Sequence, residues 1–167
     1  MIYTEKRKYL NYLVEEYSDM VYRLAMARTK EKENAEDVYQ EVFLRLSKKI
    51  PNFESTEHEK AWIIRVTINC SKNILSSKHL KHNVELKENI YDDNTVPDKN
   101  DEANDLYCVV LDLPLKYRTV IHLFYYEGYK IEEISKILKT KENTVKSWLS
   151  RARERIKTKM EEGAKNE

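Results

Sequence analysis

The sequence has few residues that break helices: its 167 residues include two glycines and three prolines. This scarcity excludes collagen, arrays of β-hairpins and the glycine-rich loops that cradle phosphates, and it favours long helices. The longest apolar run, Cys108–Leu111, is far shorter than the roughly 20 residues that span a bilayer. No apolar segment opens the chain, so we expect no secretory signal peptide.

The chain also has few residues that form covalent or metal-bound sites. Its two cysteines, Cys70 and Cys108, follow no pattern, which is typical of a reduced cytosolic protein. His79 and His82 match no common zinc spacing, and the acidic segment 92–102 lacks the glycine and the distal glutamate of a calcium loop. No nucleophile–base pair, phosphate loop or pair of carboxylates stands out. We therefore expect no metal, no cofactor and no catalytic residues.

Charged residues are abundant, at 35%, although the net charge is only +1. Residues 60–84 contain five basic side chains and no acid, and residues 136–159 contain nine basic side chains and two acids. Residues 85–105, in contrast, contain eight acids and two lysines. Two basic segments separated by an acidic strip indicate two contacts with a polyanion, although chance clustering on solvated helix faces would look the same.

Apolar residues recur at steps of three and four along the first half of the chain, which is the period of an amphipathic helix. The sequence predicts a helix over residues 5–29, and then a second helix for which Asn34 is the N-cap and Pro51 marks the end. A loop follows to Glu57, and a third helix covers residues 58–76. The core stripe of the second helix is formed by Ala35, Val38, Val42 and Leu46.

The periodicity disappears over residues 77–105 and returns after them. The helices predicted for the last third are, in order, 103–112, 115–127 (closed by Gly128), 131–138 and 141–160. The predicted fold class is therefore all-α, with two small helical domains joined by a flexible acidic linker. We place the first domain, the linker and the second domain at residues 1–80, 81–102 and 103–167.

The third predicted helix keeps a single polar arc when its residues are placed on a helical wheel. The arc contains Trp62 together with Arg65, Asn69, Lys72, Asn73 and Ser76. This mixture suits single-stranded nucleic acid, because cations meet phosphates, amides read base edges and an aromatic ring stacks on an unpaired base. The alternative is that Trp62 packs on the preceding helix with its indole N–H exposed.

Residues 128–153 have the proportions of a helix-turn-helix. Lys139 and Thr140 occupy the turn, and Thr140 is suited to cap the second helix. The buried face of the first helix is predicted to consist of Ile131, Ile134 and Leu138, and that of the second helix of Val145, Leu149, Ala152 and Ile156. On the opposite side of the second helix, where a recognition helix reads the major groove, lie Asn143, Thr144, Lys146, Ser147, Ser150 and Arg151. The alternative is a plain αα-hairpin with a charged outer face.

In this combination and order, the features resemble the extracytoplasmic-function (ECF) sigma factors, the smallest members of the sigma-70 class of bacterial RNA polymerase subunits. Residues 35–46 look like region 2.2, residues 53–73 look like regions 2.3 and 2.4, and residues 113–155 look like region 4. The family usually has Gly, Pro and Ala at the positions where this chain has Lys139, Lys141 and Ser135.

The resemblance implies a promoter-specific sigma factor, not itself an enzyme, and it assigns residues to three contacts. Core polymerase, through its β′ clamp helices, is implied to contact Asp37, Gln40, Glu41, Leu44 and Arg45. The single-stranded −10 element, with a flipped base in the loop 52–57, is implied to contact Asn52, Phe53, Trp62, Arg65, Asn69, Lys72 and Asn73. The duplex −35 element is implied to contact Lys141, Asn143, Thr144, Lys146, Ser147, Ser150, Arg151 and Arg153.

Further partners follow from the same resemblance. It implies contact with the β flap of the polymerase and binding by an anti-sigma factor, which is membrane-bound for many relatives. It implies a cytoplasmic protein, held at the membrane where such an anti-sigma factor binds it, with no small-molecule substrate. The rival interpretation is a stand-alone helix-turn-helix regulator whose residues 1–80 sense a signal or dimerise. The polar arc with Trp62 and the region 2.2-like stretch argue against that rival.

Overall fold

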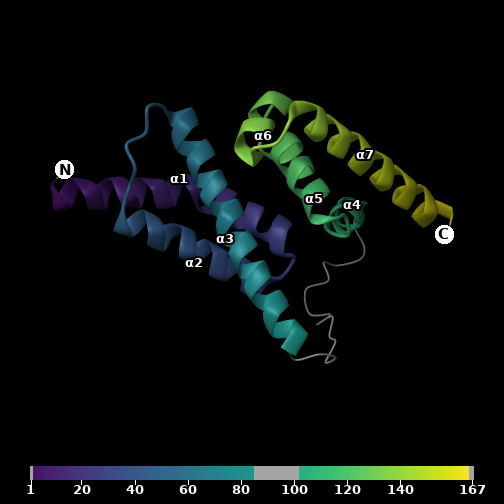
Figure 1. Ribbon diagram of the computed structural model, residues 1–167, viewed down its shortest axis with the longest axis horizontal. Coiled ribbons are helices and arrows are strands. Elements are labelled where there is room, and N and C mark those ends of the chain that lie inside the picture. Colours follow the sequence, from purple (N-terminus) through teal and green to yellow (C-terminus); the bar gives the residue numbers. More distant parts are fainter. Residues whose placement is uncertain (1, 85–101, 166–167) are drawn as a thin grey trace. The chain divides into compact units, whose positions relative to one another are not determined.

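The computed structural model describes residues 2–84 and 102–165, and the side chains of residues 2–77 and 105–165. The described residues form helices and no strand, so the all-α prediction is confirmed for them. The chain divides into two compact units, Met1–Ile90 and Tyr91–Glu167, which we call unit 1 and unit 2 (Figure 1). None of the described helices is both long enough and apolar enough to cross a membrane. Of the predicted linker, residues 81–102, the part from 85 to 101 lies outside the described residues.

Unit 1 is a bundle of three helices, α1 (Tyr3–Thr29), α2 (Lys32–Lys48) and α3 (Thr56–Val84). Only Lys30 and Glu31 separate α1 from α2. Lys30 adopts a left-handed conformation with a φ of 66°, and its N–H donates to the carbonyl oxygen of Met26 at 2.9 Å, which ends α1. In Figure 1, α3 crosses the other two helices, and it packs against both of them.

Each helix of unit 1 buries one face against the other two. The predicted apolar stripe of α2 is completely buried, which confirms it: its members are Ala35, Val38, Val42 and Leu46. The largest fully buried side chains that α1 and α3 add are Leu13, Leu24, Ile63 and Ile64. Each such side chain contributes about 1.5–3 kcal/mol to stability through burial. Burial of this continuous core therefore holds unit 1 together.

Two local predictions for unit 1 are wrong. Glu31, not Asn34, stands at the N-cap of α2, and Asn34 is buried with its Nδ2 donating to Oε2 of Glu31 at 3.0 Å. The tight turn at Lys30 lets the helix begin earlier than a capping pattern suggests. In addition, α3 continues to Val84, beyond the predicted end at residue 76. Residues 77–84 contain no glycine or proline, and serine or histidine costs a helix only tenths of a kcal/mol.

Unit 2 begins with α4 (Glu102–Leu111) and α5 (Leu115–Ile121). α5 runs directly into a π-helical turn, η2 (His122–Tyr126), and α6 (Ile131–Leu138) and α7 (Glu142–Lys165) follow. α7 therefore continues beyond the end predicted at residue 160. α5 and α6 both pack against α7, as does α4, so α7 is the helix on which the unit is assembled.

The core of unit 2 largely follows the predicted pattern. In α7 the predicted residues Val145, Leu149 and Ala152 are completely buried, whereas the predicted Ile156 is half-buried. In α6 the buried apolar side chains are Ile134 and Ile137, whereas the predicted Ile131 and Leu138 are half-buried. Gly128, which was predicted to close the helix before it, has a φ of 71°, a conformation that suits glycine.

Candidate nucleic-acid and polymerase interfaces

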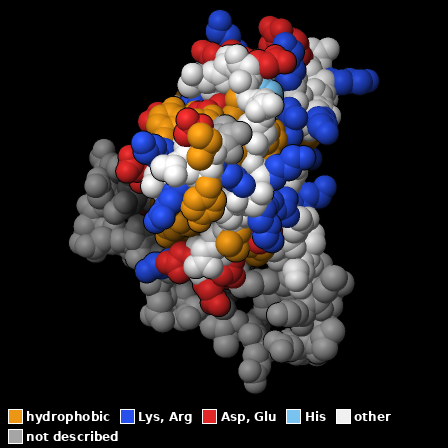
Figure 2. Space-filling view, turned by 90° about the vertical axis from the view of Figure 1, so that its left-hand side faces the viewer, with side chains coloured by type: hydrophobic (Ala, Val, Ile, Leu, Met, Phe, Trp, Pro, Cys, Tyr) orange, Lys and Arg blue, Asp and Glu red, His pale blue; other side chains and the backbone are white. Residues whose placement is uncertain are grey.

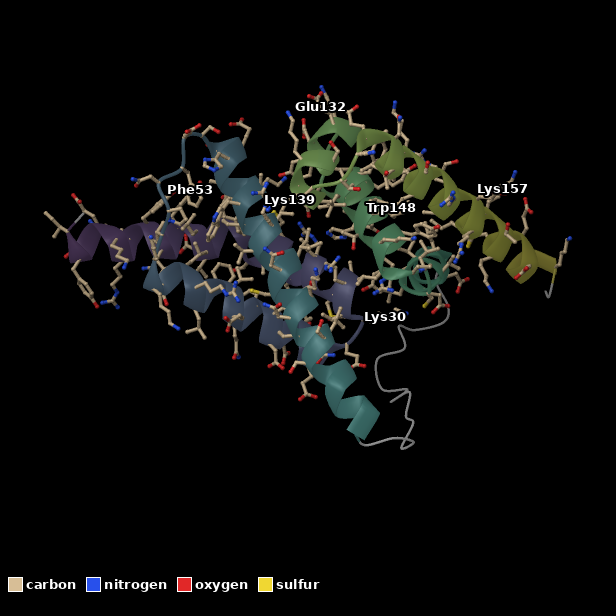
Figure 3. The ribbon with its side chains drawn as sticks, viewed as in Figure 1. Lys30, Phe53, Glu132, Lys139, Trp148 and Lys157 are labelled. Atoms are coloured by element: carbon tan, nitrogen blue, oxygen red, sulfur yellow. The ribbon has the colours of Figure 1, made fainter. Side chains whose placement is uncertain are left out.

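Three rings gather where the loop before α3 meets the first turns of that helix. Phe53 lies on this loop (Figure 3), and its ring meets those of Trp62 and His58 edge-on, with centroids 5.6 Å apart in both pairs. Ser55 accepts a hydrogen bond from the N–H of His58 at 3.1 Å, and the N–H of Glu54 donates to Nδ1 of His58 at 3.2 Å. These bonds fix the loop against α3, because they satisfy donors at the start of the helix and in the loop itself.

The structure therefore brings Phe53 and Trp62, both assigned to the −10 element from the sequence, into a direct ring contact that was not predicted. Both rings are half-buried, so each keeps part of its surface open to a ligand. Trp62 lies against the loop through its ring contact with Phe53. Asn52, on the same loop, is exposed.

The polar arc of α3 continues away from these rings. Asn69, Lys72 and Asn73 are exposed, and Arg65 is half-buried. The Nε of Arg65 is buried and has no hydrogen-bond partner among the described residues. The arc is thus a continuous polar surface that starts at the aromatic rings.

The buried carboxylate of Glu59, in the first turns of α3, ties the start of this helix to α1. Glu59 is 6% exposed and accepts hydrogen bonds from the hydroxyls of Tyr9 and Tyr17, the second at 2.7 Å. Burial, the hydrogen bond and the negative charge of Glu59 raise the pKa of both tyrosines, so the hydroxyls stay protonated as donors. Sequence analysis missed this site, since Glu59 stands next to Lys60 in a segment that reads as a solvated helix start.

The predicted polymerase-binding residues share one side of α2. Asp37, Gln40 and Leu44 are exposed, and Leu44 keeps 53% of its surface open. Glu41 accepts a hydrogen bond from Nε of Arg45 at 3.1 Å, and this bond raises the pKa of the guanidinium. These residues thus form one exposed side of α2 that is partly apolar and partly polar.

Several apolar side chains near the beginning of α1 are exposed. Figure 2 looks onto the side from which α1 begins, and apolar side chains show there between charged ones. Ile2, just before α1, and Tyr3 and Tyr12 of α1 are 69%, 80% and 43% exposed. None of them was predicted as a site residue.

In unit 2, α6 and α7 form the predicted helix-turn-helix, with a turn at residues 139–141. Lys139 has a φ of 53°, so a lysine adopts the left-handed conformation that glycine adopts more easily. α7 begins at Glu142, and the N–H of Val145 donates to the carbonyl oxygen of Lys141. The residue just before the helix is therefore Lys141 and not Thr140, and the prediction that Thr140 caps α7 is wrong.

The outer side of α7 is open and basic over its first three turns. Thr144 is half-buried, and the other predicted −35 residues are exposed: Lys141, Asn143, Lys146, Ser147, Ser150, Arg151 and Arg153. Hydroxyls, one amide and several cations thus stand on a single helix face. These are the groups that read base edges and bind phosphates in a major groove.

Aromatic side chains lie on two sides of α7, one from the helix itself and one from η2. Trp148 (Figure 3) lies 5.7 Å from the ammonium of Lys116, on the side where α5 packs. On the other side, Nε of Arg153 donates to the hydroxyl of Tyr125 at 2.7 Å. Neither contact was predicted from the sequence, since each joins elements far apart along the chain.

The described residues show no arrangement that points to a metal. No group of three or more His, Cys, Asp and Glu side chains among them could hold an ion. A cavity of about 500 Å³ lies between α4, α5 and α7, with an apolar floor at Leu113 and Tyr117 and a charged rim at Arg151, Glu154 and Arg155. Its lining contains no nucleophile paired with a base.

An all-α chain with a helix-turn-helix and a second basic helix face falls in the class of helix-turn-helix DNA-binding proteins. Two family models match it: "Sigma-70 region 2" over residues 13–80 and "Sigma-70, region 4" over residues 103–156. The chain belongs to the ECF sigma factors of the sigma-70 family, which direct RNA polymerase to promoters.

Individual relatives agree with this assignment. The chain is 30% identical to the ECF RNA polymerase sigma factor SigM of Bacillus subtilis, over 90% of this chain and 94% of that protein. It is also 30% identical to SigE of Mycolicibacterium smegmatis, over 87% of this chain, and it spans 59% of that longer protein. Among solved structures, the sigma factor RpoE of Bartonella quintana has a similar fold, with a TM-score of 0.70, 21% identity, and coverage of 92% of this chain and 98% of the other.

Proposed function

We propose that this chain binds core RNA polymerase, recognises the −35 element as duplex with unit 2, and recognises and opens the −10 element with unit 1. In this proposal residues 1–80 act as sigma region 2 and residues 103–167 as sigma region 4. The linker between them was predicted at residues 81–102, but α3 continues to Val84 and α4 begins at Glu102, so the linker of this proposal is residues 85–101. The pairing of Phe53 with Trp62 at the head of a polar, basic helix face carries the proposal. A reader of duplex DNA gains little from such rings, because stacked base pairs hide their faces.

The −10 surface consists of the aromatic pair and the arc that follows it. Stacking on an aromatic ring returns about 1–3 kcal/mol per base, which offsets the few kcal/mol that unstacking a base costs. Arg65, Asn69, Lys72 and Asn73 supply the phosphate and base-edge contacts beside the rings, and Asn52 lies on the loop that receives the flipped base. The surface thus offers both the energy for opening and the groups for sequence choice.

The −35 surface is the exposed side of α7. We assign Arg151, Arg153 and Lys146 to phosphates and Asn143 and Ser147 to base edges, since arginine and lysine position a protein on DNA whereas short polar groups at the helix start reach bases. Lys141, Thr144 and Ser150 complete the surface. In this assignment the buried residues of α7, Val145, Leu149 and Ala152, contribute to stability and not to DNA binding.

The polymerase-binding surface is the side of α2 around Leu44, with Asp37, Gln40, Glu41 and Arg45. We propose the β′ clamp helices as its partner and the β flap as a partner of unit 2. An anti-sigma factor is a further partner in this proposal, as in much of the family. The protein then acts by binding and not as an enzyme, and it works in the cytoplasm, where polymerase and promoters are found.

One experiment tests the proposal against the rival of a stand-alone regulator. The full chain is mixed with core polymerase of the source bacterium and fragmented genomic DNA, and the run-off transcripts are sequenced. We expect the chain to co-elute with core polymerase and the transcripts to start downstream of a shared pair of elements. A chain that binds duplex DNA but neither co-elutes with the polymerase nor yields such transcripts is a regulator of the rival kind.

A further inference from the structure

One arginine on the flank of α7 is held by two rings from a different element. Nε of Arg153 donates to the hydroxyl of Tyr125 at 2.7 Å, and the two residues are 28 positions apart. The guanidinium carbon lies 5.3 Å from the ring centroid of Phe124 and 5.6 Å from that of Tyr125. The two rings meet edge-on at 4.9 Å, so η2 presents them as one unit to the arginine.

This arrangement orders the guanidinium of Arg153 and leaves its terminal N–H donors accessible. An exposed arginine ordinarily spreads over many rotamers, and ordering it costs about 2 kcal/mol. Here one hydrogen bond and two cation–π contacts order it, although Arg153 remains exposed and Tyr125 is 55% exposed. The bond uses Nε alone, and the described residues provide no partner for the terminal nitrogens of the guanidinium. Those nitrogens are therefore available to bind an external acceptor.

The charges around Arg153 indicate which acceptor this is. Lys146, Arg153 and Lys157 recur along α7 at steps of seven and four residues, so they lie on one flank of the helix, with Ser150 between them. All four side chains are exposed. Lys157 lies farther along α7 toward its C-terminal end (Figure 3). A row of cations that includes an ordered guanidinium fork matches successive phosphates of one DNA strand.

We infer that Tyr125 is a positioning residue for DNA binding: with Phe124 it aims the guanidinium of Arg153 at a phosphate of the strand that borders the −35 element. Lys146 and Lys157 contact neighbouring phosphates of the same strand. The inference rests on the proposed function of α7 and adds to it a contact that is independent of base sequence. Tyr125 itself need not touch DNA.

A double-mutant cycle with holoenzyme tests the inference. Tyr125→Phe keeps the ring and removes the hydroxyl, and Arg153→Ala removes the cation. The probe is a promoter duplex taken from the run-off experiment. We expect Tyr125→Phe to weaken promoter binding about two- to tenfold, the range of one hydrogen bond, and Arg153→Ala to weaken it at least as much. The double variant should be no weaker than Arg153→Ala, and Arg153→Ala should flatten the salt dependence by about one charge.

Tyr126→Phe is the matched control, because Tyr126 is a neighbouring tyrosine, is 58% exposed and stacks on His122. It should bind the promoter as the parent does. Parent-like binding by Tyr125→Phe, or additive effects in the double variant, would overturn the inference. So would a loss of core polymerase binding in place of promoter binding, since the surface would then serve a protein partner. If Lys146→Ala and Arg151→Ala weaken promoter binding while the Tyr125 variant does not, this inference alone fails. If those two variants are also without effect, the proposed function of α7 fails.

Discussion

Lys139 occupies a backbone conformation that a lysine adopts at a cost. A left-handed φ such as its 53° costs a residue with a Cβ about 1–2 kcal/mol, whereas glycine loses about 0.5–1 kcal/mol of unfolded-state freedom. Lys139→Gly should therefore raise the free energy of unfolding of unit 2 by about 0.5–1 kcal/mol. Hydrogen exchange of α6 and α7 in a urea titration of the full chain measures this change.

Lys136→Gly provides the control for the Lys139 substitution. Lys136 is exposed and lies inside α6, where glycine costs about 1 kcal/mol relative to a good helix former. The two glycine substitutions should thus change stability in opposite directions. Equal losses at both positions would show that the turn does not strain Lys139.

At this scale the sequence predicted exposed residues better than contacts between distant ones. A helical wheel placed Asn69, Lys72 and Asn73 correctly on an open face, because that placement depends only on local period. It could not place Glu59 against Tyr17, or Tyr125 against Arg153, since those contacts depend on how two helices cross. A charge in a sequence is read as solvated by default, and only the packed structure shows that Glu59 is buried.

The side of α2 around Leu44 is a feature of a whole element, because five residues share one side of one helix. Reversing Asp37 and Glu41 to lysine should weaken core polymerase binding by at least about 2 kcal/mol, as for an interface hot spot. Folding should survive, since Asp37 is exposed and Glu41 pairs only with Arg45 on the surface. A sedimentation titration with core polymerase measures the affinity.

Glu15→Lys controls for charge alone. Glu15 is an exposed acid of α1 and not of the helix that carries the proposed surface. Its reversal should leave polymerase binding within about twofold of the parent. If Glu15→Lys weakens binding as strongly as the double reversal, net charge and not this surface determines the affinity.

The head of α3 gives a second element-scale prediction. Trp62→Ala should reduce open-complex formation at a duplex promoter by about tenfold or more, because one stacked base returns about 1–3 kcal/mol. Permanganate reactivity of promoter thymines with holoenzyme measures opening. Trp62→Phe keeps an aromatic face beside Phe53 and should recover most of the activity.

A pre-melted promoter separates opening from binding in this test. Trp62→Ala should bind it with a smaller deficit than it shows in opening duplex DNA, since the cost of unstacking is already met. Should the alanine variant open duplex promoter as well as the parent does, Trp62 only packs against Phe53. The −10 role would then pass to the loop around Asn52 and to the rest of the arc.

The sequence predicted which helices exist better than it predicted where they begin and end. The helical period of the apolar residues and the scarcity of glycine and proline identify α1, α2 and α6 correctly. The ends failed where backbone geometry decided them: the left-handed Lys30 lets α2 begin before Asn34, and Lys141 takes the place expected of Thr140 before α7. The π-helical turn η2 carries no sequence signal of its own, because its residues fit an α-helical pattern equally well.

At the scale of the whole molecule, each unit has a core of its own. Leu149 of α7 is completely buried, and Leu149→Ala should cost unit 2 about 2–5 kcal/mol. We expect hydrogen exchange in unit 2 to accelerate while that of unit 1 stays unchanged, because the contacts of Leu149 lie within unit 2. Leu24→Ala in α1 should produce the mirror image. Loss of protection in both units from either substitution would mean that the chain unfolds as one cooperative body.

The placement of the two tryptophans gives the molecule a pair of built-in optical reporters. The chain has two tryptophans, Trp62 in unit 1 beside Phe53 and Trp148 in unit 2 near the ammonium of Lys116. Indole emission is quenched by a stacked base and responds to a change in a nearby charge. With the other ring replaced by phenylalanine, each tryptophan would time one event in a stopped-flow experiment, Trp62 the capture of the −10 strand and Trp148 the docking on the −35 duplex. The order in which a promoter is engaged could thus be recorded without attaching any dye.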